Sequence, residues 1–281
     1  HGGVGLLGTG LLVAFDSGSV SVAALPRGPG RRRVEGFVRA ALDPGALVPS
    51  PAGPNIIRRD ELKEALAGAL GKVAPGGGKA TLFLPDGIAR LAVVTPPSGA
   101  DPRDFLRFRL ASSLPWPASD AIIDLLPAGR GRVVGAAVRR GTVAQYEQLA
   151  VSAGLTVERV HLGPLAALGS LLGRGGRSGV HAILGDAAVC LAVIRGGDLA
   201  AFSSRRRDPS EGEAERLLAE ASRAARLAGD ADSPVQLVLS GSDAGRLREV
   251  LGPASTASGG LEGPREWPEA VEAAWLAGVL S

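Results

Sequence analysis

The stretch LVAFDSGSVSVAAL, Leu12 to Leu25, consists of an apolar run, a short turn of small and acidic residues, and a second apolar run. This pattern predicts two antiparallel strands joined by a tight turn at Asp16 to Ser19. A similar stretch opens the second half of the chain, where Val180 to Leu184 and Val189 to Ile194 flank Gly185-Asp186. Alternating helices and strands follow each of these meanders. The repetition predicts two α/β halves with mixed sheets that face each other across a cleft.

The remaining pattern of apolar residues, caps and breakers predicts the other helices and strands. Strands are expected at Leu11–Phe15, Ser19–Leu25, Arg33–Ala41, Ala80–Leu84, Arg90–Thr95, Ala121–Leu126, Val133–Val138, Thr156–His161, Val180–Leu184, Val189–Ile194, Leu199–Ser203 and Val235–Ser240. Helices are expected at Arg59–Leu70, Asp104–Ser113, Val143–Ala153, Gly163–Leu172, Glu213–Leu227, Asp243–Leu251 and Pro268–Leu280. Asp101 is expected to cap the second helix and Thr142 the third, and Gly71 is expected to end the first. The segment Gly252 to Pro264 is expected to be a loop.

Composition excludes several classes of function. Three Trp, one Tyr and six Phe in 281 residues are too few for a surface that stacks single-stranded nucleic acid. The net charge of +3 is also small, so no nucleic-acid partner is expected. The clusters Arg31–Arg33 and Arg205–Arg207 are expected in solvated loops, with contact to anionic lipid or a partner as the alternative. A single cysteine, Cys190, excludes a disulfide framework, and the three histidines lack metal-ligand spacing.

The chain has no apolar stretch of the length that a membrane-spanning helix requires. The longest such stretches, Gly5 to Phe15 and Val180 to Ile194, fall short of about 18 residues. The sequence therefore predicts a soluble protein of a reducing compartment.

Three turns that follow strands are candidates for binding phosphate. The first contains Asp16, Gly18 and Ser19, the second contains Gly185, and the third is Gly241-Ser242 at the start of a helix. Small residues let backbone N–H groups approach a phosphate, and an Asp in such a turn can hold a metal-bound water. Each turn alone is a weak signal, because most turns of this kind are ordinary connections. Together, in this order, they are typical of an actin-like nucleotide fold.

The middle of the chain carries a more specific pattern. The stretches FRLASSLPWPASDAIIDLL, Phe108 to Leu126, and VVGAAVRRGTVAQYEQLAVSAGLTVERVHLGPLAALGSLL, Val133 to Leu172, resemble the type IV pilus assembly protein PilM and the related type II secretion protein GspL. In that family a helix ends in Leu-Pro-aromatic-Pro, and strands with Asp and Ala-Val, a helix and an Ala-Gly-Leu turn follow. The matching residues here are Leu114-Pro115-Trp116-Pro117, Asp124, Ala137-Val138 and Ala153-Gly154-Leu155.

The resemblance implies a duplicated actin-like, or ribonuclease H-like, α/β fold with a small inserted α+β subdomain. On this basis the first half is expected at 4–97, the inserted subdomain at 98–161, a connecting helix at 162–177 and the second half at 178–281. The second half is expected to be reduced, because only Arg205 to Gly212 separates its strand meander from the long helix. In PilM-like proteins several helices occupy that position and enclose the adenine.

The resemblance also implies a function and partners. Family members are scaffolds at the cytoplasmic face of the inner membrane, and they bind the cytoplasmic tail of a bitopic partner that is PilN-like or GspM-like. They link that partner to a motor ATPase, and a homodimer is possible. Phe108, Leu114 and Trp116 are expected to contact the partner in a groove between the inserted subdomain and the first half. Packing against the neighbouring half is the alternative for Trp116.

Departures from the family pattern concern the nucleotide. Where the family has a Lys after the first turn, this chain has Ser21 or Val22, and Asp186 follows Gly185 instead of preceding it. The third turn has Ser242 where the family has a second Gly. Asp16, Gly18, Ser19, Gly185, Gly241 and Ser242 are therefore expected to form a vestigial nucleotide site.

The expectation that follows is a scaffold that is not an enzyme and has no bound cofactor. The alternative is an active actin-like ATPase or small-molecule kinase that uses ATP and Mg²⁺. A filament-forming protein like actin or FtsA is a third possibility, and it needs the contacts of the missing subdomain. A GspL-like protein would continue into a transmembrane helix after residue 281.

Overall fold

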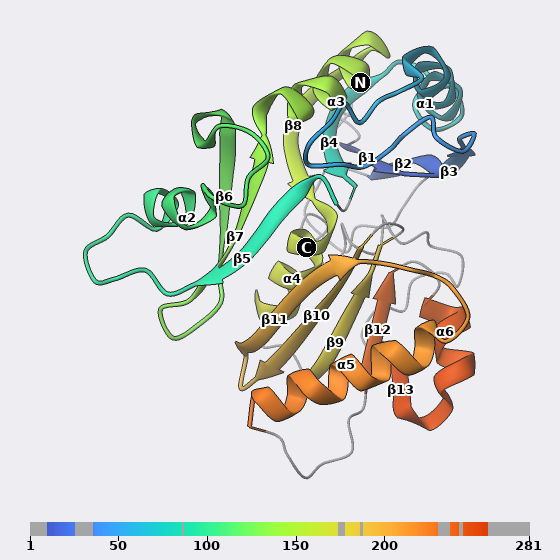
Figure 1. The fold of residues 1–281 in the computed structure, drawn as a ribbon. Helices are drawn as coiled ribbons and strands as arrows, with labels where there is room; N and C mark the ends of the chain where they lie inside the picture. Colours follow the sequence, from blue (N-terminus) through green and yellow to red (C-terminus); the bar gives the residue numbers. More distant parts are fainter. Residues whose placement is uncertain are drawn as a thin grey trace, which may run out of the picture.

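The computed structural model describes residues 10–25, 36–85, 87–173, 178–185, 188–229, 237–241 and 244–257. These residues form two five-stranded sheets and one three-stranded sheet (Figure 1). The predicted helix Pro268–Leu280 and the cluster Arg31–Arg33 lie outside the described residues. No helix in the described part of the chain combines the length and the apolar character that crossing a bilayer requires.

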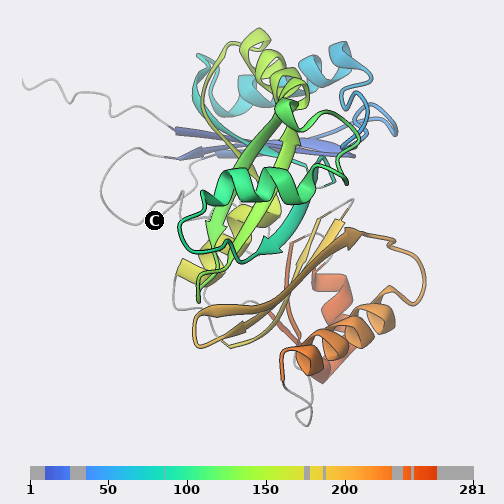
Figure 2. The same cartoon turned by 60° about the vertical axis from the view of Figure 1, so that its left-hand side comes forward.

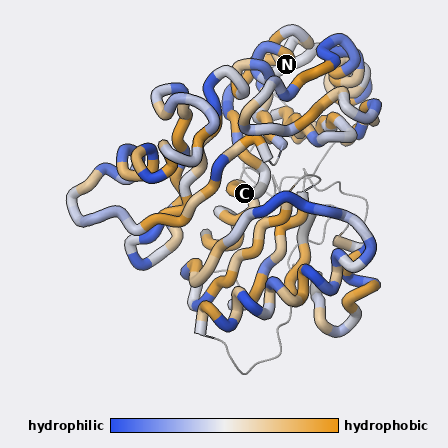
Figure 3. Tube along the Cα trace, viewed as in Figure 1, coloured by the Kyte–Doolittle hydropathy of each residue, from blue (hydrophilic) through white to orange (hydrophobic). Residues whose placement is uncertain are grey.

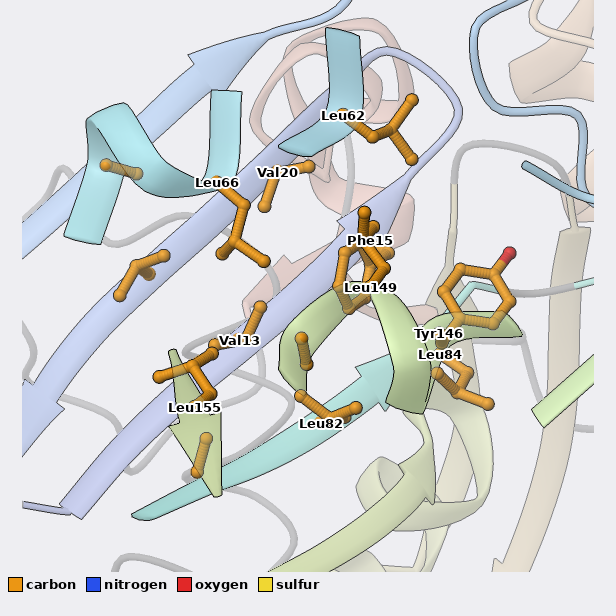
Figure 4. Packing of buried hydrophobic residues seen from close by; sticks show 14 of the residues in the cluster. Val13, Phe15, Val20, Leu62, Leu66, Leu82, Leu84, Tyr146, Leu149 and Leu155 are labelled. Atoms are coloured by element: carbon orange, nitrogen blue, oxygen red, sulfur yellow. The ribbon is translucent and has the colours of Figure 1, made fainter. Parts of the chain in front are cut away.

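The first sheet has the strand order β3-β2-β1-β4-β8. Its strands are β1 (Gly10–Asp16), β2 (Ser19–Leu25), β3 (Gly36–Ala41), β4 (Gly78–Leu84) and β8 (Leu155–Leu162). The first three strands are antiparallel, and β4 and β8 extend the sheet in parallel from β1. Helices α1 (Arg59–Val73) and α3 (Arg140–Ser152) pack on one face, where their apolar residues meet those of the strands (Figure 4).

The second sheet repeats this plan with the order β11-β10-β9-β12-β13. Its elements are β9 (Gly179–Leu184), β10 (Ala188–Arg195), β11 (Asp198–Arg206), α5 (Glu213–Leu227), β12 (Leu237–Gly241), α6 (Ala244–Leu251) and β13 (Ser255–Ala257). Again three antiparallel strands are followed by two parallel ones, which confirms the predicted duplication. The connection from β11 to α5 is short, residues 207–212, as predicted for a reduced second half.

The third sheet has the order β5-β7-β6 and belongs to the inserted subdomain. It consists of β5 (Ala89–Val94), β6 (Ala121–Pro127) and β7 (Val133–Arg139), with α2 (Pro102–Leu110) packed against it and a 3₁₀ turn, Ala118–Asp120, before β6. The predicted limits of this subdomain, 98–161, need correction. Strand β5 pairs with β7 and so belongs to the insertion, whereas β8 pairs with β4 and α3 packs with the first half.

Helix α4 (Gly163–Gly173) joins the two halves. Its apolar residues share a core with the inserted sheet and with β9 and β10, so that three parts of the molecule meet at this helix (Figure 2). Coloured by hydropathy, β9 and β10 are largely apolar, whereas α5 alternates between hydrophilic and hydrophobic residues (Figure 3). Amphipathic helices and mostly apolar central strands are typical of α/β layers.

Several predicted ends of elements differ from the structure. Helix α1 continues through Gly71 to Val73, because this glycine is not in a left-handed conformation, and α2 ends at Leu110. Thr142 is not a cap: the helix already begins at Arg140, and the Thr142 side chain is buried. Strand β13 lies in the predicted loop, where three small residues pair with β12. The predicted cap at Asp101 is confirmed, since its carboxylate accepts hydrogen bonds from the N–H groups of the first helical turn.

Candidate functional site

Two hollows border the inserted subdomain. The first, which we call the groove, has a volume of about 320 Å³ and lies between the inserted sheet and the first half, against β8 and α3. The second, which we call the cleft, has a volume of about 1030 Å³. It lies between the first strand turn, the Pro-rich segment 42–51, the start of β5 and the end of β11. The two hollows therefore share the inserted subdomain as a wall.

The groove is formed by the face of one sheet and the edge of another. From β6 and β7 only alternate residues line it, namely Ile122, Asp124, Ala136 and Val138, as expected for a sheet face. From β8, by contrast, the six consecutive residues 157–162 line it, as expected when a strand presents its edge. Strand β8 is the last strand of the first sheet, so no described strand pairs with that edge. Such an edge can accept an additional strand.

The groove combines an apolar floor with titratable side chains. The carboxylates of Asp124 on β6, Glu147 on α3 and Glu158 on β8 line it, together with Arg159 and His161. Glu158 forms an ion pair with Lys79 at 2.6 Å. Among the described groups that line the groove, carboxylates thus outnumber guanidinium groups.

His161 is the unusual member of this set. Its ring stacks on Phe83 with centroids 5.6 Å apart, and its Nε2 atom is buried with no hydrogen-bond partner in the described part of the chain. Burial lowers the pKa of His161; the nearby carboxylate of Asp124 opposes this shift and Arg159 adds to it. Burial therefore favours the neutral imidazole.

The first predicted phosphate turn is hydrogen-bonded within the protein. The Ser19 hydroxyl is buried and accepts a hydrogen bond from Arg39 Nε at 2.9 Å. The Gly18 carbonyl accepts a hydrogen bond from the Leu42 N–H, also at 2.9 Å. Of the predicted residues in this turn, Gly18 lines the cleft, whereas Asp16 and Ser19 are not among its described lining residues. Ser21 and Val22, the two residues expected where the family has a Lys, are both buried in β2.

The second predicted turn is held by an arginine. Arg207 Nη1 donates to the Gly185 carbonyl at 2.9 Å, and the guanidinium forms an ion pair with Glu213 at 2.6 Å. Glu213 also pairs with Arg246 at 2.7 Å. Gly241 lies at the end of β12, opposite Leu184, while Asp186 and Ser242 lie outside the described residues.

The cleft has a cationic wall. Arg90, Arg205, Arg206 and Arg207 line it, and none of its described lining residues is acidic. Arg205 pairs with Glu220 at 2.7 Å. The prediction that Arg205–Arg207 is a solvated loop is wrong, because the first two residues end β11 and the third is buried.

The three residues predicted to bind a partner do not line the groove. Trp116 is buried, and its indole Nε1 donates to the Pro51 carbonyl of the first half at 2.6 Å, which agrees with the packing alternative. Leu114 packs at the border of the core of the inserted subdomain. Phe108 is 79% exposed on α2, outside the groove. The sequence analysis did not identify the residues of β8 as part of the site. Glu158 and Arg159 are two charged residues within a predicted strand, and such residues indicate a sheet edge.

Comparison with known proteins supports the fold. No protein-family model matches the sequence, and neither does any curated protein. Among solved structures, a PilM–PilN type IV pilus biogenesis complex matches with a TM-score of 0.65 and 16% identity, over 88% of this chain and 87% of the other. The cytoplasmic domain of EpsL, an inner-membrane component of the type II secretion system of Vibrio cholerae, matches with a TM-score of 0.57 and 13% identity, over 98% and 96%.

A third similar structure is a Bacteroides thetaiotaomicron protein of unknown function with an actin-like ATPase fold. It matches with a TM-score of 0.59 and 10% identity, over 88% of each chain. The chain therefore has the predicted actin-like fold, and both the groove and the cleft border its inserted subdomain. At these identities the similarity concerns the fold alone.

Proposed function

We propose that this protein is a non-catalytic scaffold of a type IV pilus or type II secretion assembly platform at the inner face of the inner membrane. Its groove binds the cytoplasmic tail of a PilN-like or GspM-like bitopic partner, and the scaffold links this partner to the motor ATPase. The observation that carries the proposal is the β8 edge, which faces the apolar side of the inserted sheet in a fold shared with a PilM–PilN complex.

The groove suits an extended peptide. A strand added to β8 forms backbone hydrogen bonds along residues 157–162, and these supply affinity for almost any sequence. Alternate side chains of the peptide then point toward Ile122, Ala136 and Val138, where apolar contact selects among sequences. Asp124 and Glu147 stand at the same face and favour a peptide without acidic side chains there.

The proposal includes a vestigial nucleotide site. Its support is that two residues expected near phosphates are occupied by hydrogen bonds within the protein. The Ser19 hydroxyl accepts one from Arg39, and the Gly185 carbonyl accepts one from Arg207. The buried residues Ser21 and Val22 supply no cation, and the short connection 207–212 leaves no room there for a subdomain that encloses an adenine. The arginines of the cleft would then be the main cations that neutralise the charge of a bound phosphate.

A second candidate function is an actin-like ATPase or small-molecule kinase. The cleft favours it, because about 1030 Å³ is ample for a nucleotide and the wall is cationic. Catalysis in the cleft also requires a carboxylate that holds Mg²⁺, and none of its described lining residues supplies one.

The experiment that tests the scaffold proposal is peptide binding measured by fluorescence anisotropy, with the N-terminal cytoplasmic peptide of the PilN-like or GspM-like protein of the same organism. Two sets of peptides carry N-methyl groups at odd or at even positions. If the peptide adds to β8, one set loses affinity by at least tenfold and the other binds normally, because only alternate N–H groups face the edge. Equal binding of both sets would contradict β-addition.

A matched pair of protein variants locates the site. Glu147→Gln removes one negative charge from the groove, whereas Gln148→Lys adds one positive charge on the exposed side of the same helix, outside the groove, so both variants change the net charge by +1. The proposal expects a change in peptide affinity for the first variant and none for the second. The same change in both variants would assign the effect to net charge, and the groove would not be the site.

A further inference from the structure

The turn between β6 and β7 is in direct contact with the second half. Leu199 N–H donates to the Ala128 carbonyl at 3.0 Å, and Arg132 Nη1 donates to the Ala200 carbonyl at 3.2 Å. Arg130 Nε forms an ion pair with Asp198 Oδ2 at 3.2 Å. Both arginine contacts join residues that are 68 positions apart in the chain, at the tip of the inserted sheet and at the start of β11.

The backbone of this turn is specialised for the contact. Gly129 and Gly131 have φ values of +81° and +72°, and Arg130 between them, at +51°, is the non-glycine residue with a left-handed conformation among those the structure describes. A Cβ atom on Gly129 would overlap the carboxylate of Asp198, whereas one on Gly131 would meet nothing within 4 Å. Strained conformations persist where the surroundings hold them in place.

Apolar side chains next to the turn extend the contact between the inserted subdomain and the second half. Ala128, Val134 and Ala136 of the inserted subdomain share one core with Leu199 and with the apolar residues of α4, β9 and β10. Figure 2 shows the end of the inserted sheet beside the strands of the second half. The polar contacts of the turn are thus the outer part of a continuous interface.

The inserted sheet is therefore held at both ends. At one end β5 and β7 connect to the first half, since Ala89 pairs with Val138 and α3 begins at Arg140. At the other end the turn at residues 128–132 contacts the second half through a backbone hydrogen bond and an ion pair. The same sheet forms one wall of the groove through β6 and β7, and one wall of the cleft through β5.

We propose that the β6–β7 turn is a latch that fixes the inserted subdomain against the second half and so sets the widths of both the groove and the cleft. With the latch closed, the groove is preorganised for an extended peptide, a role that rests on the proposed function. With the latch open, the sheet pivots on its connections to the first half, and a peptide must order the groove as it binds. Latch closure then raises the affinity for the peptide, and bound peptide raises the equilibrium constant for latch closure by the same factor.

The test uses two glycine variants of the same turn. Gly129→Ala and Gly131→Ala introduce the same methyl group at similar φ values, but only the first meets Asp198. Spin labels at Ser112→Cys, an exposed position of the inserted subdomain, and at Leu227→Cys, an exposed position on α5, report the distance between the two parts. Cys190 is fully buried, so it does not react with the label in the folded protein.

The latch predicts one narrow distance distribution for the parent and for Gly131→Ala, and a broadened or shifted one for Gly129→Ala. Peptide affinity is expected to fall about fivefold in Gly129→Ala relative to Gly131→Ala. Identical distributions in both variants would overturn the proposal. If the parent binds no peptide but Gly129→Ala still broadens the distribution, the proposed function fails and the latch stands. Should Gly129→Ala fail to fold, Arg130→Gly replaces it, because this change removes the exposed ion pair with Asp198 without adding bulk or backbone strain, and a smaller broadening in the same direction is expected.

Discussion

At the residue scale, a buried asparagine organises the Pro-rich wall of the cleft. Asn55 is fully buried, and its Nδ2 donates to the carbonyls of Ser50 and Gly53 at 2.9 and 3.1 Å. Its Oδ1 accepts from the Ser50 N–H at 3.2 Å and from the Tyr146 hydroxyl at 3.3 Å. This side chain therefore ties the segment that contributes to the cleft to helix α3 of the first half.

The hydrogen bonds of Asn55 predict an ordered pair of destabilised variants. Asn55→Ala removes several buried hydrogen bonds and leaves backbone groups unpaired, so its free energy of unfolding is expected to fall by about 3 kcal/mol. Tyr146→Phe removes one long hydrogen bond and retains the ring contact with Phe15, so a loss of about 1 kcal/mol is expected. Urea unfolding of both variants checks the order, and a larger loss for Tyr146→Phe would contradict it.

The Tyr146 phenol also predicts the alkaline limit of stability. Burial, and secondarily the negative charge of Asp16, raise its pKa far above the ordinary value of 10.0. Because the folded-state pKa is the higher one, the contribution of this group is complete below pH 10 and is lost as the pH rises above 10. Stability measured by urea unfolding between pH 9 and 11 should fall less steeply for Tyr146→Phe than for the parent. Parallel curves would contradict this assignment.

At the scale of elements, the packing of α2 on the inserted sheet depends on a glycine. A Cβ atom on Gly135 of β7 would overlap the side chain of Leu106 of α2, which is fully buried. Gly135→Ala is therefore expected to cost about 2 kcal/mol through overpacking. Leu106→Ala is expected to cost about 3 kcal/mol through a cavity.

The two changes are expected to compensate in part. The methyl group added at position 135 fills space that Leu106→Ala vacates, so the double variant should lose less stability than the sum of the single variants. Thermal unfolding of the four proteins measures this coupling. Strict additivity would mean that helix and strand are not in the contact that the structure shows.

Elements that depend on local signals were predictable, and those that depend on pairing were not. Helix α5 begins and ends where its amphipathic pattern predicts, and Asp101 caps α2 through a local hydrogen bond. Strand β13 consists of Ser255, Thr256 and Ala257, which carry no apolar period, and it exists through its pairing with β12. The sheet to which β5 and β8 belong is likewise set by distant partners, which explains the shifted limits of the inserted subdomain.

The location of the candidate site was predicted better than its residues. A groove between the inserted subdomain and the first half follows from the resemblance, and the structure has one there. Trp116 was placed in it because aromatic residues beside prolines are typical anchors, but its indole packs on Pro51 instead. Charged residues such as Glu158 and Arg159 indicate an edge strand, but which hollow that edge borders is a property of the assembled sheets, so β8 was not placed in the groove from sequence.

At the scale of the whole molecule, shared cores predict a single unfolding transition. Helix α4, the inserted sheet and the second half contribute to one apolar cluster that includes Cys190, which is fully buried on β10. Cys190 should therefore react with a thiol reagent only as the chain unfolds. Its reactivity and the far-UV circular dichroism are expected to change at the same urea concentration. Earlier exposure of the thiol would show that the second half unfolds separately.

The central claim is that the groove binds a partner peptide while the actin-like cleft no longer serves a nucleotide. The most direct test is isothermal titration calorimetry of the purified protein with the N-terminal cytoplasmic peptide of the PilN-like or GspM-like partner and, separately, with Mg-ATP. Micromolar peptide binding without heat from Mg-ATP is the predicted result. Tight binding of Mg-ATP would contradict the vestigial nucleotide site and would favour an enzyme in the cleft, whereas no binding of the peptide would contradict the scaffold.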